Sequence, residues 1–357
     1  MALAMPVVWT DRHRLHDPGA EIFVGVRTPA AEVPARAEAI RAALEGAPTV
    51  AARAQPDAGV LAVHDRALVE YLEAAWAQWE AAGLPSDPGQ DRVVPYVFAH
   101  PGLLSGRPPA SPAAAWARPG LFAYDTMTLI GPGTWEAARA AVDVALTAAE
   151  LVLAGAPCAY ACCRPPGHHV TSTCYGGSCY LNNAAAAAAR LREGLGGPVA
   201  VLDVDAHHGN GTQAVFYERA DVLVGSVHVD PGAGWFPHFL GFADETGAGD
   251  GAGANRNVPL APGSDDGAWV AAVAELADWA REHGARGLVV ALGVDAAEGD
   301  PESPLRATAA GFRAAGRALG ALGLPTVVVQ EGGYELGTIG ALVRAALAGI
   351  EDGLRGA

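Results

Sequence analysis

The chain has 357 residues, of which 51% are hydrophobic and 17% are charged, and its formal net charge is −16. This composition is typical of a folded globular protein and argues against a disordered chain. The strong negative charge disfavours non-specific nucleic-acid binding and gives weak support for a cationic substrate, so we expect no nucleic-acid partner.

The N-terminal segment and the cysteines both indicate a cytoplasmic protein. Residues 1–10, MALAMPVVWT, lack a basic region and contain Pro6, so they do not predict a signal peptide. Every stretch of about 18 residues is interrupted by a charged residue or a helix breaker, so we expect no membrane-spanning helix. The five cysteines lie between positions 158 and 179 without a CxxC pair. We expect reduced, buried thiols rather than a disulfide framework or a zinc site.

The first distinctive region in chain order is a Pro-, Gly- and Ser-rich segment at about 83–123 with scattered aromatic residues. A loop of this length inside a compact domain is usually either functional or a linker. We expect an elaborated loop, because the segment before it also fits the domain. Residues 1–357 are therefore predicted to form one domain.

Beyond this segment, short apolar runs alternate with Ala-rich helical stretches. The predicted strands are 158–163, 199–205, 222–229, 287–294 and 324–330. The predicted helices are 134–154, 182–194, 264–284 and 305–322, and a glycine-rich loop is expected at 241–257. Near-continuous apolar strands that alternate with helices indicate an α/β fold with a parallel sheet covered on both faces.

Four polar motifs directly follow apolar runs. They are RPPGHH (164–169), DAHHGNG (205–211), GVDAAEGDP (293–301) and QEGGY (330–334). In a parallel sheet the carboxyl ends of the strands lie along one edge, and ligands bind at that edge. We therefore expect the four motifs to converge on one site.

Two of the motifs contain the residues of a catalytic metal site. Asp205 and His207 lie two residues apart, so their side chains face the same side of an extended strand end, and Asp295 takes the equivalent place on another strand. Two carboxylates and one imidazole leave an open coordination position, as in catalytic zinc sites. Because the anionic ligands largely neutralise the metal, a separate general base is needed, and His168 and His169 are the candidates.

The two histidines are predicted to have different partners. Asp203 and Asn210 are both available nearby, and an aspartate partner raises the pKa of a histidine whereas a neutral asparagine does not. Tyr334 follows two glycines, including Gly332, which permit close approach of the backbone. A tyrosine hydroxyl beside a metal stabilises a developing oxyanion, a contribution of about 2.7–4 kcal/mol for one such donor.

In combination, RPPGHH, DVDAHHGNG and EGGY resemble the zinc-dependent histone deacetylase superfamily, closest to bacterial acetylpolyamine amidohydrolases and class II-like deacetylases. Segments 13–40, 63–72 and 124–138 fit as well, with Arg36 at the place of a buried arginine, so the resemblance spans most of the chain. It implies the arginase/deacetylase fold, a single α/β domain with an eight-stranded parallel sheet flanked by helices.

The resemblance also implies a role for each motif residue. It implies that His169 is the general base or acid nearest the water, paired with Asn210, that Asp203 holds His168, and that Tyr334 polarises the amide carbonyl. Asn210 stands where class I members place an aspartate, which indicates the class II or polyamine branch. The implied zinc ligands are Asp205, His207 and Asp295. The implied potassium ligands are Asp203, Asp205, His207, Ser226 and the carbonyl of Val227.

The implied substrate-binding residues are Gly177, Ser178, Trp235, Phe236, Gly332 and Asp125. Ser178 departs from the family pattern, because an aromatic residue usually lines the acyl-lysine tunnel at this position. The serine is expected either to widen the tunnel or to leave space that Tyr175 or the 83–123 loop fills. Either Phe236 or Trp235 supplies the opposite aromatic wall. Asp125 is expected either to attract a cationic substrate or to cap a turn, and the sequence leaves both open.

The leading hypothesis is a zinc amidohydrolase that removes acetyl groups from small cationic amines such as acetylpolyamines. In the polyamine branch the long loop and dimerisation narrow the entrance, so a homodimer is expected. A protein or acetyl-lysine deacetylase and a metabolite-tailoring deacetylase are the alternatives. An arginase-like dimanganese enzyme would need further bridging carboxylates, which DAHHGN and DAA do not supply. A non-enzymatic member would normally have lost ligands or the tyrosine, and this chain keeps them.

Overall fold

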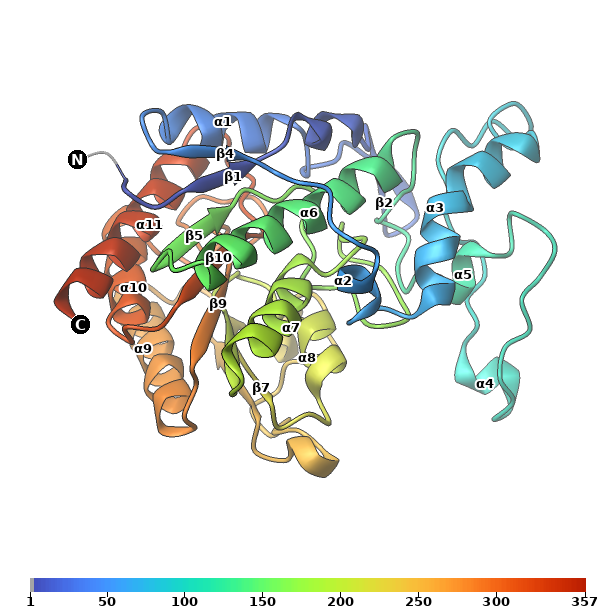
Figure 1. Cartoon of the computed structure of the whole chain (residues 1–357). Coiled ribbons are helices and arrows are strands. Elements are labelled where there is room, and N and C mark those ends of the chain that lie inside the picture. The colour runs from blue at the N-terminus through green and yellow to red at the C-terminus, as the bar shows by residue number, and fades with distance from the viewer. Residues whose placement is uncertain (1–2) are drawn as a thin grey trace.

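The computed structural model describes residues 3–357, and an eight-stranded parallel sheet forms its centre (Figure 1). The strand order is β4-β1-β5-β10-β9-β6-β7-β8, and every neighbouring pair is parallel. This sheet confirms the predicted fold class. The strands are β1 (Val7–Trp9), β4 (Thr49–Ala51), β5 (Cys158–Ala161), β6 (Val199–Asp203), β7 (Val222–Val229), β8 (Asn255–Leu260), β9 (Gly287–Leu292) and β10 (Thr326–Gln330).

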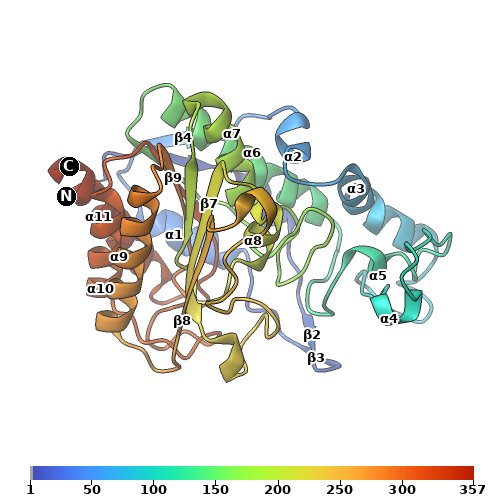
Figure 2. The ribbon, with the colours of Figure 1, turned by 90° about the horizontal axis from the view of Figure 1, so that it is seen from below.

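Helices cover both faces of the sheet because alternate strand side chains point to opposite sides. In β9, Val289 and Ala291 pack on one face, whereas Leu288 and Val290 pack on the other. Figure 2 shows α9, α10 and α11 on one side of the sheet and α6 and α7 on the other. The first face is covered by α6 (Thr134–Leu153) and α7 (Asn183–Leu195), and buried residues of α3 (Arg66–Ala81) extend the same core cluster outward. The second is covered by α1 (Ala35–Ala43), α9 (Asp266–Glu282), α10 (Ala309–Gly320) and α11 (Ile339–Gly356).

Most of segment 83–123 is irregular, and with α3 it projects from the body of the molecule (Figure 1). Val93 ties it to the core by pairing with Ile130. An antiparallel hairpin of β2 (Glu21–Phe23) and β3 (Val26–Thr28) projects on the same side (Figure 2). The remaining helices are short: α2 (Ala58–Leu61), α4 (Pro101–Leu104), α5 (Pro119–Phe122) and α8 (Asn210–Phe216). Single 3-10 turns are formed by Asp11–Leu15, Pro231–Ala233 and Gly249–Gly251.

The predicted strands and helices are present with shifted ends. The strand predicted over 199–205 ends at Asp203, because the Asp203 carboxylate accepts a hydrogen bond from the backbone N–H of Asp205 (3.1 Å) and turns the chain out of the ladder. The loop predicted at 241–257 gives way to β8 at Asn255. Because this edge strand contains several polar residues, a search for apolar runs does not predict it.

Four strands that precede the polar motifs lie side by side. They occupy consecutive positions β5-β10-β9-β6, so their carboxyl ends meet at one edge, as predicted. All five cysteines are unpaired, and four of them are buried. No helix within residues 3–357 has both the length and the apolar composition needed to cross a membrane.

Candidate active site

The carboxyl edge of the sheet brings together three side chains that fit a metal ion. The Nδ1 atom of His207 lies 3.1 Å from Asp295 Oδ2 and 3.3 Å from Asp205 Oδ1. Candidate ligand atoms of Asp205, His207 and Asp295, which we call the metal triad, all lie within 4.8 Å of one another. The backbone N–H of Ala206 donates to Asp295 (2.8 Å), and that of Gly332 donates to Asp205 (2.8 Å). These bonds orient both carboxylates toward His207.

The electrostatics of these residues favour a bound cation. Asp205 and Asp295 are both fully buried. Burial raises the pKa of Asp295, and the neighbouring charge of Asp205 raises it further, to about 7. Two buried carboxylates in contact are stable as anions only with a cation between them. One imidazole and two carboxylates with an open side toward a cavity are a donor set that zinc accepts.

Gly332 permits this close packing. A Cβ atom at Gly332 would lie 2.3 Å from Asp295 Oδ2 and 2.5 Å from Asp205 Oδ2. No side chain fits there without displacing both carboxylates. The structure therefore places Gly332 behind the metal triad rather than in the cavity wall.

The two adjacent histidines make different hydrogen bonds. The imidazole of His168 bonds through Nδ1 to Asp203 Oδ2 (2.9 Å), and that of His169 bonds through Nδ1 to Asn210 Oδ1 (2.6 Å). Their ring centroids are 4.0 Å apart. Because the amide oxygen of Asn210 only accepts, His169 Nδ1 carries the proton and its Nε2 is left to accept another.

The pKa values of the two imidazoles move in opposite directions. Burial alone would lower the pKa of His168, but Asp203 and Asp205 outweigh burial and raise it to about 10. Burial also lowers the pKa of His169, and the positive charge of His168 lowers it further. His168 is therefore a cation and His169 a neutral base at pH 7.

Tyr334 lies at the cavity wall and is held from two sides. Its backbone N–H donates to Asp300 Oδ2 (2.7 Å), and the guanidinium of Arg36 lies 4.6 Å from its ring centroid. Arg36 also donates to the carbonyl of Glu331 (2.6 Å). Burial raises the pKa of Tyr334 well above its ordinary value. The phenol stays protonated and is a hydrogen-bond donor to the cavity.

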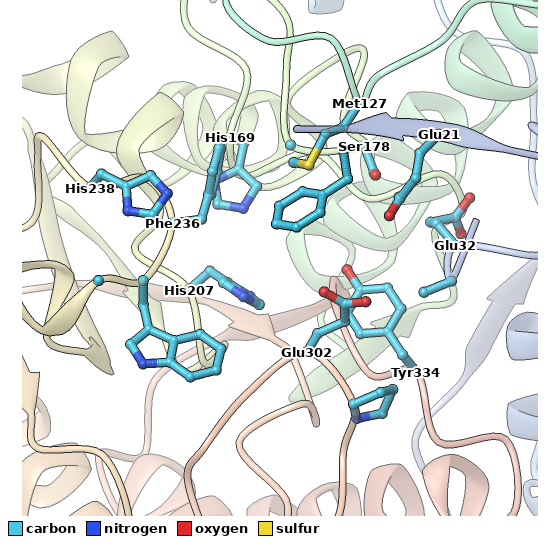
Figure 3. A pocket seen from close by; sticks show the side chains of 16 residues that line it. Glu21, Glu32, Met127, His169, Ser178, His207, Phe236, His238, Glu302 and Tyr334 are labelled. Atoms are coloured by element: carbon cyan, nitrogen blue, oxygen red, sulfur yellow. The ribbon is translucent and has the colours of Figure 1, made fainter. Parts of the chain in front are cut away.

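A cavity of about 450 Å³ opens above these groups (Figure 3). His169, His207 and Tyr334 line its inner part. The substrate-binding residues predicted from the sequence that also line it are Gly177, Ser178, Trp235 and Phe236. Both candidate aromatic residues therefore face the cavity, and Phe236 packs edge-to-face against His169 with ring centroids 4.8 Å apart.

Asp125 holds a turn next to the cavity. Its carboxylate accepts hydrogen bonds from the backbone of Met127 and Thr128, from the Thr128 hydroxyl and from the N–H of Gly177. These four donors engage both oxygens. Of the two roles left open by the sequence, the structure shows the turn-forming one.

Of the potassium residues predicted from the resemblance, Asp203 ends β6, Asp205 and His207 follow it, and Ser226 and Val227 lie on the neighbouring strand β7. Asp203 and Ser226 are direct partners in the parallel register, and both are buried. The Ser226 hydroxyl bonds to His228 Nδ1 (2.8 Å), and Val227 follows in the same buried strand.

Several site residues were not predicted from the sequence. Glu21, on the hairpin, and Glu302 both line the cavity mouth (Figure 3). Tyr124 donates from its hydroxyl to the carbonyl of His169 (3.0 Å). Asp300 lies within the motif GVDAAEGDP, and Glu302 directly follows it. Their closeness to this motif in the sequence could therefore have identified both as site residues. No local pattern connected Glu21 with the motifs.

Comparison with known proteins settles the family. A model of the histone deacetylase domain matches residues 30–350. The chain belongs to the histone deacetylase family. As a member of this family it is a hydrolase that acts on acetyl amides.

Several relatives match this histone deacetylase family member over nearly their whole length. It is 40% identical over 349 residues to the acetylpolyamine amidohydrolase of Mycoplana ramosa, covering 97% of this chain and 99% of the relative. It is also 40% identical to acetylpolyamine amidohydrolase 1 of Pseudomonas aeruginosa, covering 98% and 99%. The crystal structure of acetylpolyamine aminohydrolase from Burkholderia pseudomallei superposes with a TM-score of 0.91, at 38% identity and covering 97% of this chain and 98% of that one.

Proposed function

We propose that this family member is a zinc-dependent amidohydrolase that removes acetyl groups from small cationic amines such as acetylpolyamines. One observation carries the proposal: a single cavity is lined by His207 of the candidate metal site, by His169 and Tyr334, and by the carboxylates of Glu21 and Glu302 at its mouth. The names of the full-length relatives support the same substrate class.

Glu21 and Glu302 are the residues proposed to bind the amine. Both line the cavity and both are half-buried. Burial raises the pKa of Glu21, and the charge of Glu302 raises it further, to about 7. Two carboxylates that destabilise each other favour a cation between them. An ammonium group on the substrate meets this requirement at the mouth while the amide reaches the inner part of the cavity.

The catalytic steps follow from the positions of the inner residues. Asp205, His207 and Asp295 would hold the zinc ion, which when bound supplies Lewis acidity toward the amide carbonyl and water. His169 accepts the proton of the attacking water at Nε2 and returns a proton to the leaving amine. The Tyr334 hydroxyl donates to the carbonyl oxygen as negative charge develops there. His168, kept cationic by Asp203, adds positive charge beside the reacting groups.

A potassium ion is proposed near the zinc site. Asp203 and Ser226 offer buried oxygen atoms from adjacent strands, and hard oxygen donors suit an alkali cation. Asp205, His207 and the Val227 carbonyl complete the proposed set. The ion would hold β6 and β7 together beneath the metal triad.

A second copy of the chain is the proposed partner. Phe23, Val24, Phe239 and Leu240 form the rim patch, an exposed apolar surface around a shallow cavity of about 660 Å³ beside the active site. Phe239 is 86% exposed. Contiguous exposed apolar surface marks interaction sites. Light scattering should give a dimer mass for the natural chain and a monomer mass for Phe239→Asp.

The proposal further places residues 1–357 in one catalytic domain that works in the cytoplasm. Both core clusters pack on a single sheet, and the five unpaired cysteines suit a reducing compartment.

A substrate comparison on zinc-loaded protein tests the proposed function. Acetate release would be measured for acetylputrescine, acetylspermidine and acetyl-lysine peptides, together with the zinc content per chain. We expect about one zinc per chain and kcat/KM values for the small amines at least about tenfold above those for peptides. Equal values for peptides and small amines would contradict the proposed substrate class.

A further inference from the structure

We propose that Ser178 makes this enzyme accept acetylated amines that carry a substituent on the carbon next to the amide nitrogen. The short side chain of Ser178 leaves one side of the cavity open where that carbon passes. The inference rests on the proposed deacetylase function and names the shape of amine that the site takes.

The turn before Ser178 determines how close this residue lies to His169 in the cavity. Gly177 has a φ of +59°, and a Cβ atom there would lie 2.3 Å from Cδ2 of His169. The chain therefore passes directly against the proposed general base before it reaches Ser178. Ser178 lines the same cavity as His169 and directly follows the glycine that contacts this imidazole.

Hydrogen bonds hold this turn in place. The N–H of Gly177 donates to Asp125 Oδ2 (2.6 Å), and the N–H of Ser178 donates to the Thr128 hydroxyl (2.9 Å). Ser178 itself has a φ of +60°, a backbone conformation that is uncommon for a residue with a side chain. The wall is therefore rigid, and its width depends on the side chain at position 178.

The opposite wall is fixed as well. Phe236 packs against His169, and in Figure 3 Phe236 lies beside His169 while Ser178 lies beside Met127 on the other side of the view. Within residues 3–357 the Ser178 hydroxyl has no hydrogen-bond partner, so it is available to a ligand. The cavity of about 450 Å³ lies within the range of about 300–1,000 Å³ of sites that hold drug-sized molecules. A linear acetylated diamine is smaller than such molecules.

The direction of the substrate decides which of its atoms pass Ser178. The acetyl carbonyl points to the metal triad and Tyr334, and the ammonium group lies toward Glu21 and Glu302 at the mouth. The carbon that bears the amide nitrogen therefore passes between Phe236 and Ser178. A methyl or ring substituent on this carbon occupies the space beside Ser178.

Two substrates of equal charge test the inference: N-acetyl-1,4-diaminobutane and its analogue with a methyl group on the carbon that bears the acetamide. The natural enzyme should hydrolyse one enantiomer of the branched substrate with a kcat/KM within about tenfold of the linear one. Ser178→Phe should lower kcat/KM for the branched substrate by about a hundredfold and for the linear one by less than about tenfold.

Two further variants guard against misfolding of Ser178→Phe. Ser178→Asn tolerates a positive φ and should give an intermediate loss for the branched substrate only. Ser178→Gly keeps the space and should keep the natural ratio of the two kcat/KM values within about threefold. Zinc content and Tm would be measured for each variant.

The outcomes separate the inference from the proposed function. If the natural enzyme cleaves the linear substrate but neither enantiomer of the branched one, the role of Ser178 is wrong and the deacetylase function stands. Equal losses on both substrates in Ser178→Phe and Ser178→Asn would also overturn it. If neither substrate is cleaved by zinc-loaded enzyme, the proposed function fails and the inference fails with it.

Discussion

The inner part of the cavity and its mouth are built from different kinds of structure. The inner part, formed by the metal triad, His168, His169 and Tyr334, follows directly from buried strands, and backbone N–H groups or buried partners hold its side chains. The mouth, formed by Glu21 and Glu302, and the wall residues Ser178 and Phe236 beneath it come from a hairpin and loops and are half-buried. In the proposed function, the sheet positions the reacting groups and the loops select the substrate. Substitutions in the inner part should therefore lower zinc binding or kcat, whereas substitutions at the mouth should change KM.

The largest effect is expected from the metal triad. Asp295→Asn removes one anionic ligand, so zinc content should fall well below one per chain and turnover by about a thousandfold or more. Metal analysis and acetate release would check this. Asp278→Asn, on an exposed helix surface, is the matched control and should change neither quantity. Full zinc content with natural turnover in Asp295→Asn would remove Asp295 from the metal site.

The next effect concerns the oxyanion donor. Tyr334→Phe keeps the ring beneath Arg36 but removes the hydroxyl, so kcat should fall by about 10²–10³ while zinc stays bound. Tyr96→Phe, at a 72% exposed position, is the control. Unchanged kcat in zinc-loaded Tyr334→Phe would exclude the phenol from the mechanism.

A smaller change is expected when the partner of His169 is altered. Asn210→Asp places a charge beside the imidazole, and an opposite charge at this distance raises a pKa by about 1–3 units. Activity needs neutral His169 and is lost as the pH falls through this pKa. The acid limb of the kcat/KM profile should therefore move to higher pH by about one unit or more. A profile that coincides with that of the natural enzyme would show that His169 is not the base.

The smallest effects are expected at the mouth, and they should appear in KM rather than kcat. Glu302→Gln should raise KM for acetylputrescine by about tenfold and leave KM for neutral N-butylacetamide unchanged, because only the former carries an ammonium group. Glu298→Gln, whose side chain pairs with Arg306 at an exposed position, is the control. Equal changes for both substrates would contradict the proposed cation site.

The mouth should also respond to pH in a defined direction. The pKa of Glu21 is raised to about 7, so this carboxylate is charged above that pH and protonated below it. KM for acetylputrescine should therefore rise as the pH falls from about 8 to 6, and this slope should be absent in Glu21→Gln. A slope of the same size in Glu21→Gln would assign it to another group.

The same contrast explains what the sequence predicts. Each polar motif directly follows a short, continuously apolar run, so parallel-sheet geometry was enough to predict that His169, His207, Asp295 and Tyr334 come together. β1 and β4 have only three residues each, which is too short for a pattern of apolar residues to predict a strand. Their places in the sheet depend on tertiary contacts.

The mouth could not be predicted in the same way. Glu21 is brought to the cavity by a short hairpin that is far from the motifs in sequence. No pattern in the residues around Glu21 predicts that it lines the cavity. Asp125 has the same local sequence whether it binds substrate or forms a turn, and only its four hydrogen-bond donors distinguish the two.

The central claim is that inner residues built for amide hydrolysis work behind a mouth selective for cations. The most direct test is kcat/KM of the natural zinc-loaded enzyme on acetylputrescine and on N-butylacetamide, which share a chain length and differ by one ammonium group, at low and high salt. We predict a preference of at least about tenfold for acetylputrescine that shrinks as salt screens the carboxylates. Equal kcat/KM values at low salt would contradict the account.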